Sequence, residues 1–252
     1  MSKIMTPKEL GTHCAEAIDA LKKMFADFSG SDKGKMIKRA MLLAYWVKTY
    51  VRYIRAEDSF ASQSVFKLKR GSIVRVEFGY RIGKELGGRH YAAVLDVENS
   101  PYRNTVTVVP LGSIKESSER DKYSVVLKDG IFGSIQKKVD ALIEDAHRTM
   151  DEAEAMDAEI EQAEPEQKAA LKAVQRQKLD TTRNLITQAK EWLADVAHMK
   201  LGSVAKIDQI TTISKMRISQ PLKKTHPLYG VRLSADDLDK IDARLKELYF
   251  AK

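Results

Sequence analysis

The chain has 252 residues, is 43% hydrophobic and carries a formal net charge of +8, which suits one or two buried cores and favours either a polyanionic partner or simply a basic surface. Its single cysteine, Cys14, excludes an internal disulfide and fits a reducing compartment. Because the sequence shows no signal-peptide core, membrane-length apolar run, metal motif or nucleotide motif, we expect a cytoplasmic protein that needs no metal or other cofactor and does not enter a membrane.

Residues 1–65 are expected to form an N-terminal helical extension. Thr6, Pro7 and Glu9 make a capping box with proline in the first turn, and the segment FSGSDKGK ends that helix. The second helix has an apolar side made of Ile37, Met41, Ala44, Val47, Val51 and Ile54. Its other side is basic and comprises Lys38, Tyr45, Lys48, Arg52 and Arg55. The basic side either contacts RNA phosphates or an acidic partner, or is a solvated face.

Residues 66–133 change to strand character. The segments SIVRVEFG, YAAVLDV, TVTVVPL and YSVVL are short, rich in β-branched residues and separated by turn residues. This pattern predicts a small, mostly antiparallel sheet or barrel. Pro110 is expected at a strand end, an edge or a bulge, because it has no N–H to donate to a ladder.

Residues 134–200 are expected to form an inserted antiparallel coiled-coil hairpin. The first arm has a heptad stripe made of Ile135, Val139, Leu142, Ala146, Thr149, Ala153, Met156, Ile160 and Ala163. Pro165 marks the turn, and the second arm has a stripe made of Thr182, Leu185, Ala189, Trp192 and Val196. The hairpin holds 14 acidic and 10 basic residues, a net charge of −4, so we expect it to be a poor surface for RNA.

Residues 201–252 resume the strand character, which makes the hairpin an insertion within one β domain. The segment GSVAKIDQITTISKMRI predicts further strands, in which Lys215 is expected to be solvated, and the basic loop QPLKKTHPLYGVR follows. Ser234 then caps a final amphipathic helix whose apolar stripe is Leu238, Ile241, Leu245 and Leu248.

Four segments in this order, KRGSIVRVEFG, GKELGGRHYAAVL, TVTVVPLGS and GSVAKIDQITTISKMRI, resemble the MazF/PemK toxins of bacterial toxin–antitoxin pairs. The resemblance covers residues 67–128 and 201–250. It implies an α+β chain with a small SH3-like antiparallel β-barrel of the MazF/PemK/CcdB kind, usually a homodimer. It also implies a toxin that cleaves single-stranded RNA without a metal ion and is neutralised by an acidic antitoxin.

The resemblance assigns roles residue by residue, and two positions differ from the family. His90 stands where many members have the arginine held to be catalytic, with Arg89 just before it. Gly112 stands where a threonine follows valine-proline-leucine, with Ser113 just after it. The matching positions are Glu85, Gly87, Gly88, Asp208, Gln209 and Arg217. Contacts to RNA are expected from Gly87, Gly88, Asn104, Gln209 and Arg217.

Cleavage of RNA by its own 2′-hydroxyl needs a base, a donor or cation for the phosphorane, and an acid for the leaving oxygen. His90 suits either proton transfer, and Arg89 offers a planar fork for phosphate oxygens. Ser113 is a candidate donor to phosphate, and Glu85 a second base or an orienting group. Because neighbouring residues on a strand point to opposite faces, Arg89 and His90 both act through loop geometry, one acts alone, or the site binds without cutting. The alternative function is a non-catalytic RNA- or protein-binding member of the family whose hairpin recruits a partner.

Overall fold

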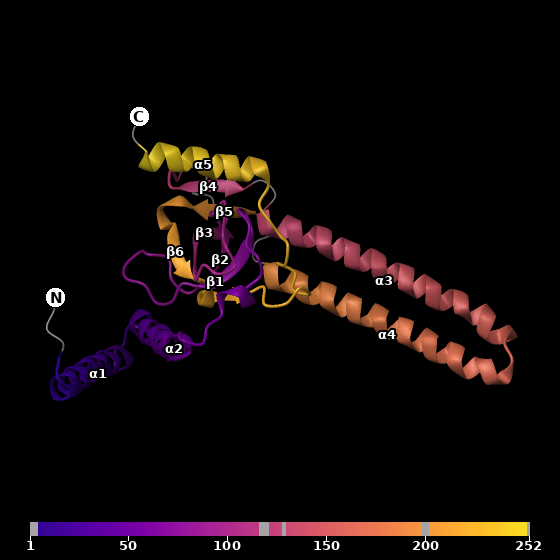
Figure 1. Ribbon diagram of the computed structural model, residues 1–252, viewed down its shortest axis with the longest axis horizontal. Coiled ribbons are helices and arrows are strands. Elements are labelled where there is room, and N and C mark those ends of the chain that lie inside the picture. The colour runs from indigo at the N-terminus through magenta and orange to yellow at the C-terminus, as the bar shows by residue number, and fades with distance from the viewer. Residues whose placement is uncertain (1–4, 116–120, 128–129, 198–201, 251–252) are drawn as a thin grey trace. The chain divides into compact units, whose positions relative to one another are not determined.

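The computed structural model describes residues 5–115, 121–127, 130–197 and 202–250. The fold is α+β, and its described helices are α1 Pro7–Ser29, α2 Gly34–Ala56, α3 Gly130–Gln162, α4 Pro165–Val196 and α5 Ala235–Tyr249 (Figure 1). The strands are β1 Ile73–Glu77, β2 Arg89–Val94, β3 Thr105–Ser113, β4 Ser124–Leu127, β5 Ser203–Lys206, β6 Thr211–Ser214 and β7 Ile218–Gln220. The chain divides into two compact units, residues 1–60 with 79–82, and residues 61–78 with 83–252.

In the first unit, α1 begins at the expected capping box. The Thr6 hydroxyl accepts from the Glu9 N–H over 3.3 Å, and the Glu9 carboxylate accepts from the Thr6 N–H over 2.8 Å. The apolar side of α2, in contrast, was expected to be buried and is not. Ile37, Met41 and Ile54 are about half exposed, and Ala40 is the only buried residue of α2 among the described residues. Two helices that have only each other as cover leave most of their apolar surface in water.

Gly79 and Trp46 form the tightest contact in this unit. Gly79 has a φ of 75°, in the left-handed region that favours glycine. A Cβ at this position would lie 2.5 Å from the Trp46 ring, which also contacts the rings of Tyr50 and Tyr53. The indole of α2 therefore packs directly on the backbone of the segment that follows β1.

Substituting Gly79 by alanine is expected to release Trp46 and to destabilise the first unit by several kcal/mol, because backbone strain of about 1–3 kcal/mol adds to the overlap. Thermal unfolding and Trp46 fluorescence in a Trp192→Phe background would measure both effects. Gly83→Ala is the matched control, since Gly83 also has a positive φ of 66° but a Cβ added there would have no atom within 4 Å. Equal losses in the two variants would assign the effect to strain alone.

The second unit is built on one open antiparallel sheet with the order β4-β5-β3-β2-β1-β7, and β6 pairs separately with β3. The long strand β3 serves two partners on one edge, because residues 105–108 pair with β6 and residues 111–113 pair with β5. Pro110 lies within β3, not at an end, an edge or a bulge as expected. It sits between the two paired segments, where neither partner strand is in register with it and its missing N–H is not needed.

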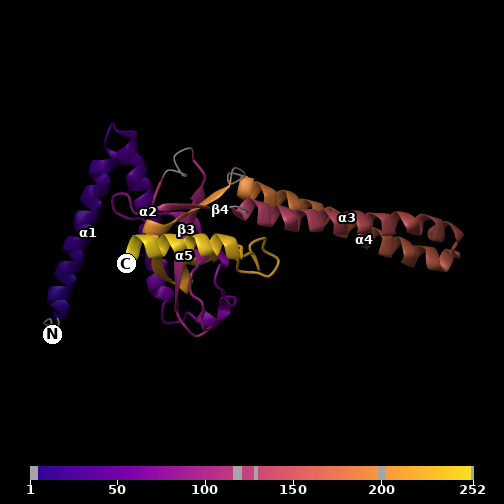
Figure 2. The ribbon, with the colours of Figure 1, turned by 90° about the horizontal axis from the view of Figure 1, so that it is seen from above.

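Each face of the sheet carries its own apolar cluster, as strand alternation requires. One face, which we call the helix-covered face, presents Ile73, Tyr91 and Leu111 to α5 and to the first turns of α3 (Figure 2). The other, which we call the opposite face, carries Val74, Val76, Phe78, Ala92, Val94, Val106, Val108, Ile213 and Ile218.

The helices α3 and α4 run side by side as the expected antiparallel hairpin (Figures 1 and 2). Gln175 Nε2 donates to the Ala153 carbonyl over 3.0 Å, which fixes the register between the arms. The base of the hairpin extends into the core of the second unit, since Ile135, Val139 and Ala189 are at most 4% exposed within the cluster of the helix-covered face. The hairpin starts at Gly130, slightly before the expected residue 134, and the expected final residues 198–200 lie outside the described residues.

Candidate functional site

The candidate site is centred on the β1–β2 connection. The Phe78 N–H donates to the Gly88 carbonyl over 2.8 Å, and Gly88 has a φ of 81°, so a glycine is required for the chain to turn back into β2 at this point. Gly87 has no positive φ and takes part through its backbone, which hydrogen-bonds to the His90 side chain. The loop therefore closes over the first residues of β2.

Arg89 and His90 point to opposite faces of the sheet. β2 begins at Arg89, whose register partner is Glu77, while the partner of His90 is Val76. Arg89 consequently shares the helix-covered face, with its Nε 3.7 Å from Glu77 Oε2 and its side chain 63% exposed. His90 shares the opposite face. Of the three alternatives left open by the sequence, joint action of the two side chains in one groove does not fit this geometry, because strand alternation starts one residue too early.

His90 is half-buried, and three causes act on its pKa. Burial disfavours the imidazolium form and lowers the pKa below its ordinary value of 6.5. The hydrogen bond to Gly87 and the negative charge of Glu77 act in the other direction but do not outweigh burial. At neutral pH the ring is therefore uncharged and can accept a proton. Extending the Tyr91–Leu111 register by one residue places His90 opposite Gly112.

Gln209 joins the loop to this region. Its Oε1 accepts from the Leu86 N–H over 2.9 Å, and its Nε2 donates to Asp208 Oδ2 over 3.1 Å. Leu86 in turn packs against the apolar cluster of the opposite face. Gln209, expected to contact RNA, thus has a bracing role in this structure, and it holds the loop on the face that carries His90.

Glu77 connects the charged residues at this end of the sheet, and the sequence reasoning missed it. Its carboxylate lies beside Arg89, its negative charge acts on His90, and its carbonyl accepts from Arg217 Nε over 2.8 Å. Its side chain is only 19% exposed. The available signal was the strand pattern, because a carboxylate at the end of β1 faces the first residue of β2.

Three other expected site residues are placed differently. Glu85 is exposed in the loop. Ser113 pairs with Ser203 at the end of β3 and, two residues from Leu111, lies on the face opposite to that of Gly112. Asn104 lies before the first residue of β3, at the far end of β2 from His90, and its carbonyl accepts from the Lys215 N–H over 2.8 Å. With six residues in β2, this separation is roughly 17 Å.

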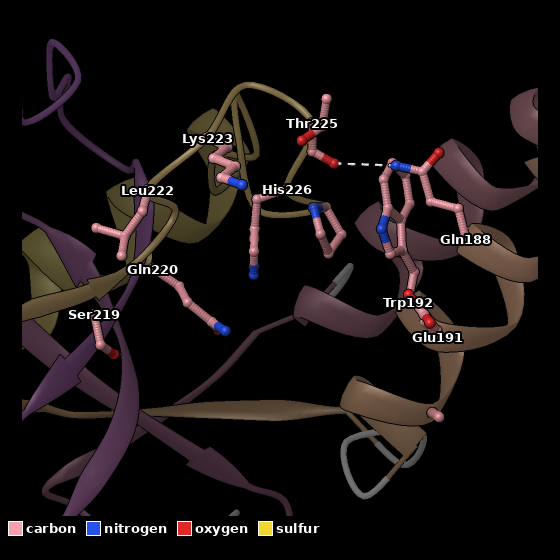
Figure 3. Close-up of a pocket in the computed structure, with 11 residues that line it drawn as sticks. Gln188, Glu191, Trp192, Ser219, Gln220, Leu222, Lys223, Thr225 and His226 are labelled. Carbon is pink, nitrogen blue, oxygen red and sulfur yellow. Dashed lines mark hydrogen bonds between the residues drawn. The ribbon is translucent and has the colours of Figure 1, made fainter. Parts of the chain in front are cut away.

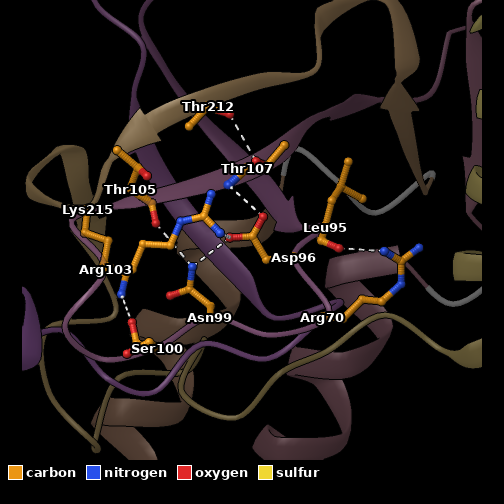
Figure 4. Close-up of polar contacts among 10 residues, drawn as sticks. All are labelled: Arg70, Leu95, Asp96, Asn99, Ser100, Arg103, Thr105, Thr107, Thr212 and Lys215. Carbon is orange, nitrogen blue, oxygen red and sulfur yellow. Dashed lines mark hydrogen bonds and ion pairs between the residues drawn. The ribbon is translucent and has the colours of Figure 1, made fainter.

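The loop between β2 and β3 is held by a buried polar cluster (Figure 4). Asp96 accepts from Asn99 Nδ2 over 2.7 Å and from the Thr107 N–H over 3.3 Å, and Arg103 lies 3.9 Å away. Lys215 is 2% exposed, not solvated as expected, and its Nζ donates to the Ser100 carbonyl over 2.8 Å. Burial lowers the pKa of Lys215, and the charge of Asp96 opposes that shift.

Removing the Asp96 carboxylate is expected to destabilise the second unit by about 2–4 kcal/mol, because it leaves a buried amide without its acceptor and a buried ammonium without its nearby anion. Urea unfolding of Asp96→Ala would measure the loss. Glu98→Ala, an exposed acid in the same loop, is the control and should stay within about 0.5 kcal/mol of the parent. Similar values for the two variants would contradict a structural role for Asp96.

A pocket of about 800 Å³ lies between the last turns of α4 and residues 219–227 (Figure 3). Both arms of the hairpin hold this segment, since Gln188 Nε2 donates to the Thr225 carbonyl over 3.3 Å and Lys138 Nζ donates to the Pro227 carbonyl over 3.0 Å. The side chains around the pocket include Gln188, Glu191, Trp192, Gln220, Lys223 and His226. An indole, an ammonium group and amides of this kind suit a flat ring next to an anionic group.

This pocket was not found from the sequence, because Trp192 fits the coiled-coil stripe equally well. Arg75 Nη1 lies 3.3 Å from Gln220 Oε1 and connects the pocket to β1 on the helix-covered face, the face of Arg89. The basic character of residues 220–232 was the available signal.

No protein-family model and no curated protein matches the chain. Among the described residues, no helix combines the length and apolarity that a bilayer span requires. The assignment of an activity therefore depends on the resemblance of the four segments and on the site geometry.

Proposed function

We propose that the chain is a toxin of the MazF/PemK type, an endoribonuclease that cuts single-stranded RNA without a metal ion, with His90 as the proton acceptor. The observation that carries the proposal is the state of His90: an uncharged, half-buried imidazole that is oriented by the Gly87 backbone at the family's catalytic position. A cognate antitoxin, a homodimer and a cytoplasmic location belong to the same proposal.

The proposal includes a finer fold, an SH3-like barrel. Its support is that β6 pairs with β3 while β7 pairs with β1, and that only the three residues of the 3₁₀ turn η4 Lys215–Arg217 separate β6 from β7. Strands at the two sides of the β1-β2-β3 meander are thereby joined by one short connection. The apolar cluster of the opposite face would then be the barrel interior, with His90 at its rim.

In the proposed reaction, His90 takes the proton of the RNA 2′-hydroxyl as the 2′-oxygen attacks the adjacent phosphorus. The P–O5′ bond breaks, which leaves a 2′,3′-cyclic phosphate and a 5′-hydroxyl after the leaving oxygen is protonated. Arg89 and Arg217, which both contact Glu77, supply positive charge at the same strand end for the crowded phosphorane.

A second candidate is a non-catalytic member that binds RNA or protein. Two observations favour it. The separation of Arg89 and His90 onto opposite faces leaves the imidazole without an adjacent guanidinium on its own strand face. In addition, Gly112, across from His90, has no hydroxyl to donate to phosphate.

The deciding experiment incubates the full chain with a mixed pool of single-stranded RNA in excess EDTA and sequences both ends of the products. The expected result is a defined set of cuts with 2′,3′-cyclic phosphate and 5′-hydroxyl ends. Retention of intact RNA together with a mobility shift would support the second candidate. Intact RNA without a shift would contradict both.

A further inference from the structure

The helix α2 carries a continuous exposed line of residues that neither the proposed reaction nor the packing of the first unit uses. Six positions spaced by four, four, three, four and three residues lie on one side of the helix, and we call them the α2 stripe: Ile37, Met41, Tyr45, Lys48, Arg52 and Arg55. All six are exposed. The stripe therefore offers about five helical turns of surface to a partner.

The α2 stripe has two chemically different halves. Its N-terminal half is apolar, with Ile37 46%, Met41 48% and Tyr45 66% exposed. Its C-terminal half is cationic, and the whole of α2 contains six Lys and Arg residues and no Asp or Glu. Within the described part of the chain, Lys48, Arg52 and Arg55 form no ion pair. An apolar patch next to unneutralised cations is typical of a protein-binding surface.

The order of the two halves along one line distinguishes between occupants. A membrane-surface helix carries its cations on the side away from its apolar face, whereas here both lie on the same side. RNA phosphates would satisfy the cationic half only and leave Ile37 and Met41 in water. A second copy would place cations against cations when parallel, and cations against apolar side chains when antiparallel.

We propose that the α2 stripe binds an acidic amphipathic helix of a partner protein. The partner helix lies antiparallel to α2, so that carboxylates in its N-terminal half face Lys48, Arg52 and Arg55. Apolar side chains in its C-terminal half cover Ile37, Met41 and Tyr45. The antiparallel direction is favoured because acidic residues stabilise the N-terminus of their own helix and cations stabilise the C-terminus of α2. This inference does not depend on the proposed ribonuclease activity.

The test uses the full chain labelled with a fluorophore at Cys14, its only cysteine, which is exposed on α1. The probe is a synthetic helical peptide of about 22 residues, long enough to span α2. It has glutamates in its N-terminal half and leucines in its C-terminal half, both on one side. The control peptide has lysines in place of the glutamates. The acidic peptide is expected to bind about tenfold tighter than the control, and less so at about 0.5 M NaCl.

Variants of α2 make the test specific. The triple reversal K48E/R52E/R55E should invert the preference, so that the lysine peptide binds more tightly than the glutamate peptide. K172E/R176E/K190E changes three exposed cations of α4 and the net charge by the same amount, and it should leave the preference unchanged. Ile37→Asp should weaken the acidic peptide about tenfold. Circular dichroism checks that each variant keeps its helical content.

Three results would overturn the proposal. The first is equal binding of the two peptides, or no binding of either. The second is an inverted preference in the α4 variant as well, which would assign the effect to net charge. The third is binding of single-stranded RNA, or of vesicles rich in anionic lipid, that K48E/R52E/R55E abolishes while the acidic peptide does not compete for it.

Discussion

Replacing His90 by alanine is expected to slow RNA cleavage by at least ~100-fold, the lower end of what one proton-transfer group contributes. The His90 ring is uncharged at neutral pH, and its orientation is fixed by the Gly87 backbone. Initial rates on single-stranded RNA in EDTA would measure the loss. His147→Ala, which removes an exposed histidine of α3, is the matched control and should cut at the parent rate.

Arg89→Ala is the informative companion to His90→Ala. Arg89 lies on the other face of β2 and contacts Glu77, so it is expected to contribute through long-range attraction and to lose less than ~10-fold. A loss equal to that of His90→Ala would show that RNA reaches both side chains around the strand end. Unchanged cleavage by folded His90→Ala protein would remove His90 from the mechanism.

The pKa of His90 also predicts the direction of the pH dependence. Because burial holds the pKa below 6.5, the neutral base is fully available at pH ~7, and the rate should fall only below that pKa, by about tenfold per pH unit. Glu77→Gln removes the charge that raises this pKa, so the fall should move to a still lower pH. An unchanged acid limb in Glu77→Gln would mean that a different group limits the rate.

The elements that depend on local spacing were predicted from the sequence. The capping box at Thr6, the proline at the start of α4 and the heptad stripe of the hairpin each follow from residues within a few turns of one another. The α+β class and the antiparallel strands also follow from local patterns. These features need no knowledge of what packs against them.

The features that were missed depend on distant parts of the chain. Whether Arg89 and His90 share a face is decided by the single residue at which β2 begins. Lys215 is buried because the loop at Ser100, more than a hundred residues earlier, closes over it. Pro110 is tolerated inside β3 because two strands that follow the hairpin change places beside it. The pattern of α2 shows which side is apolar, but not that this side stays exposed.

The hairpin should be divisible into a base that the fold requires and a tip that it does not. Replacing residues 133–200 with a short linker was expected from the sequence to leave a folded barrel. The structure indicates otherwise, because that deletion removes Ile135, Val139 and Ala189 from the main core. Losing large buried side chains costs about 2–5 kcal/mol each, and a domain has about 5–15 kcal/mol in total. We therefore expect no cooperative unfolding transition for this variant.

Removing only residues 147–181 should give a different result. Ala146 and Thr182 face each other across the hairpin, with Thr182 Oγ1 3.5 Å from the Ala146 carbonyl, so a short Gly/Ser loop can join them without moving the base. The shortened chain should unfold cooperatively, with a free energy of unfolding close to that of the parent, and should cut RNA at the parent rate. Urea unfolding, cleavage rates and light scattering would be measured on both deletions. Folding of the 133–200 deletion would show that the base is dispensable, whereas loss of cleavage in a folded 147–181 deletion would place the tip of the hairpin in the substrate path.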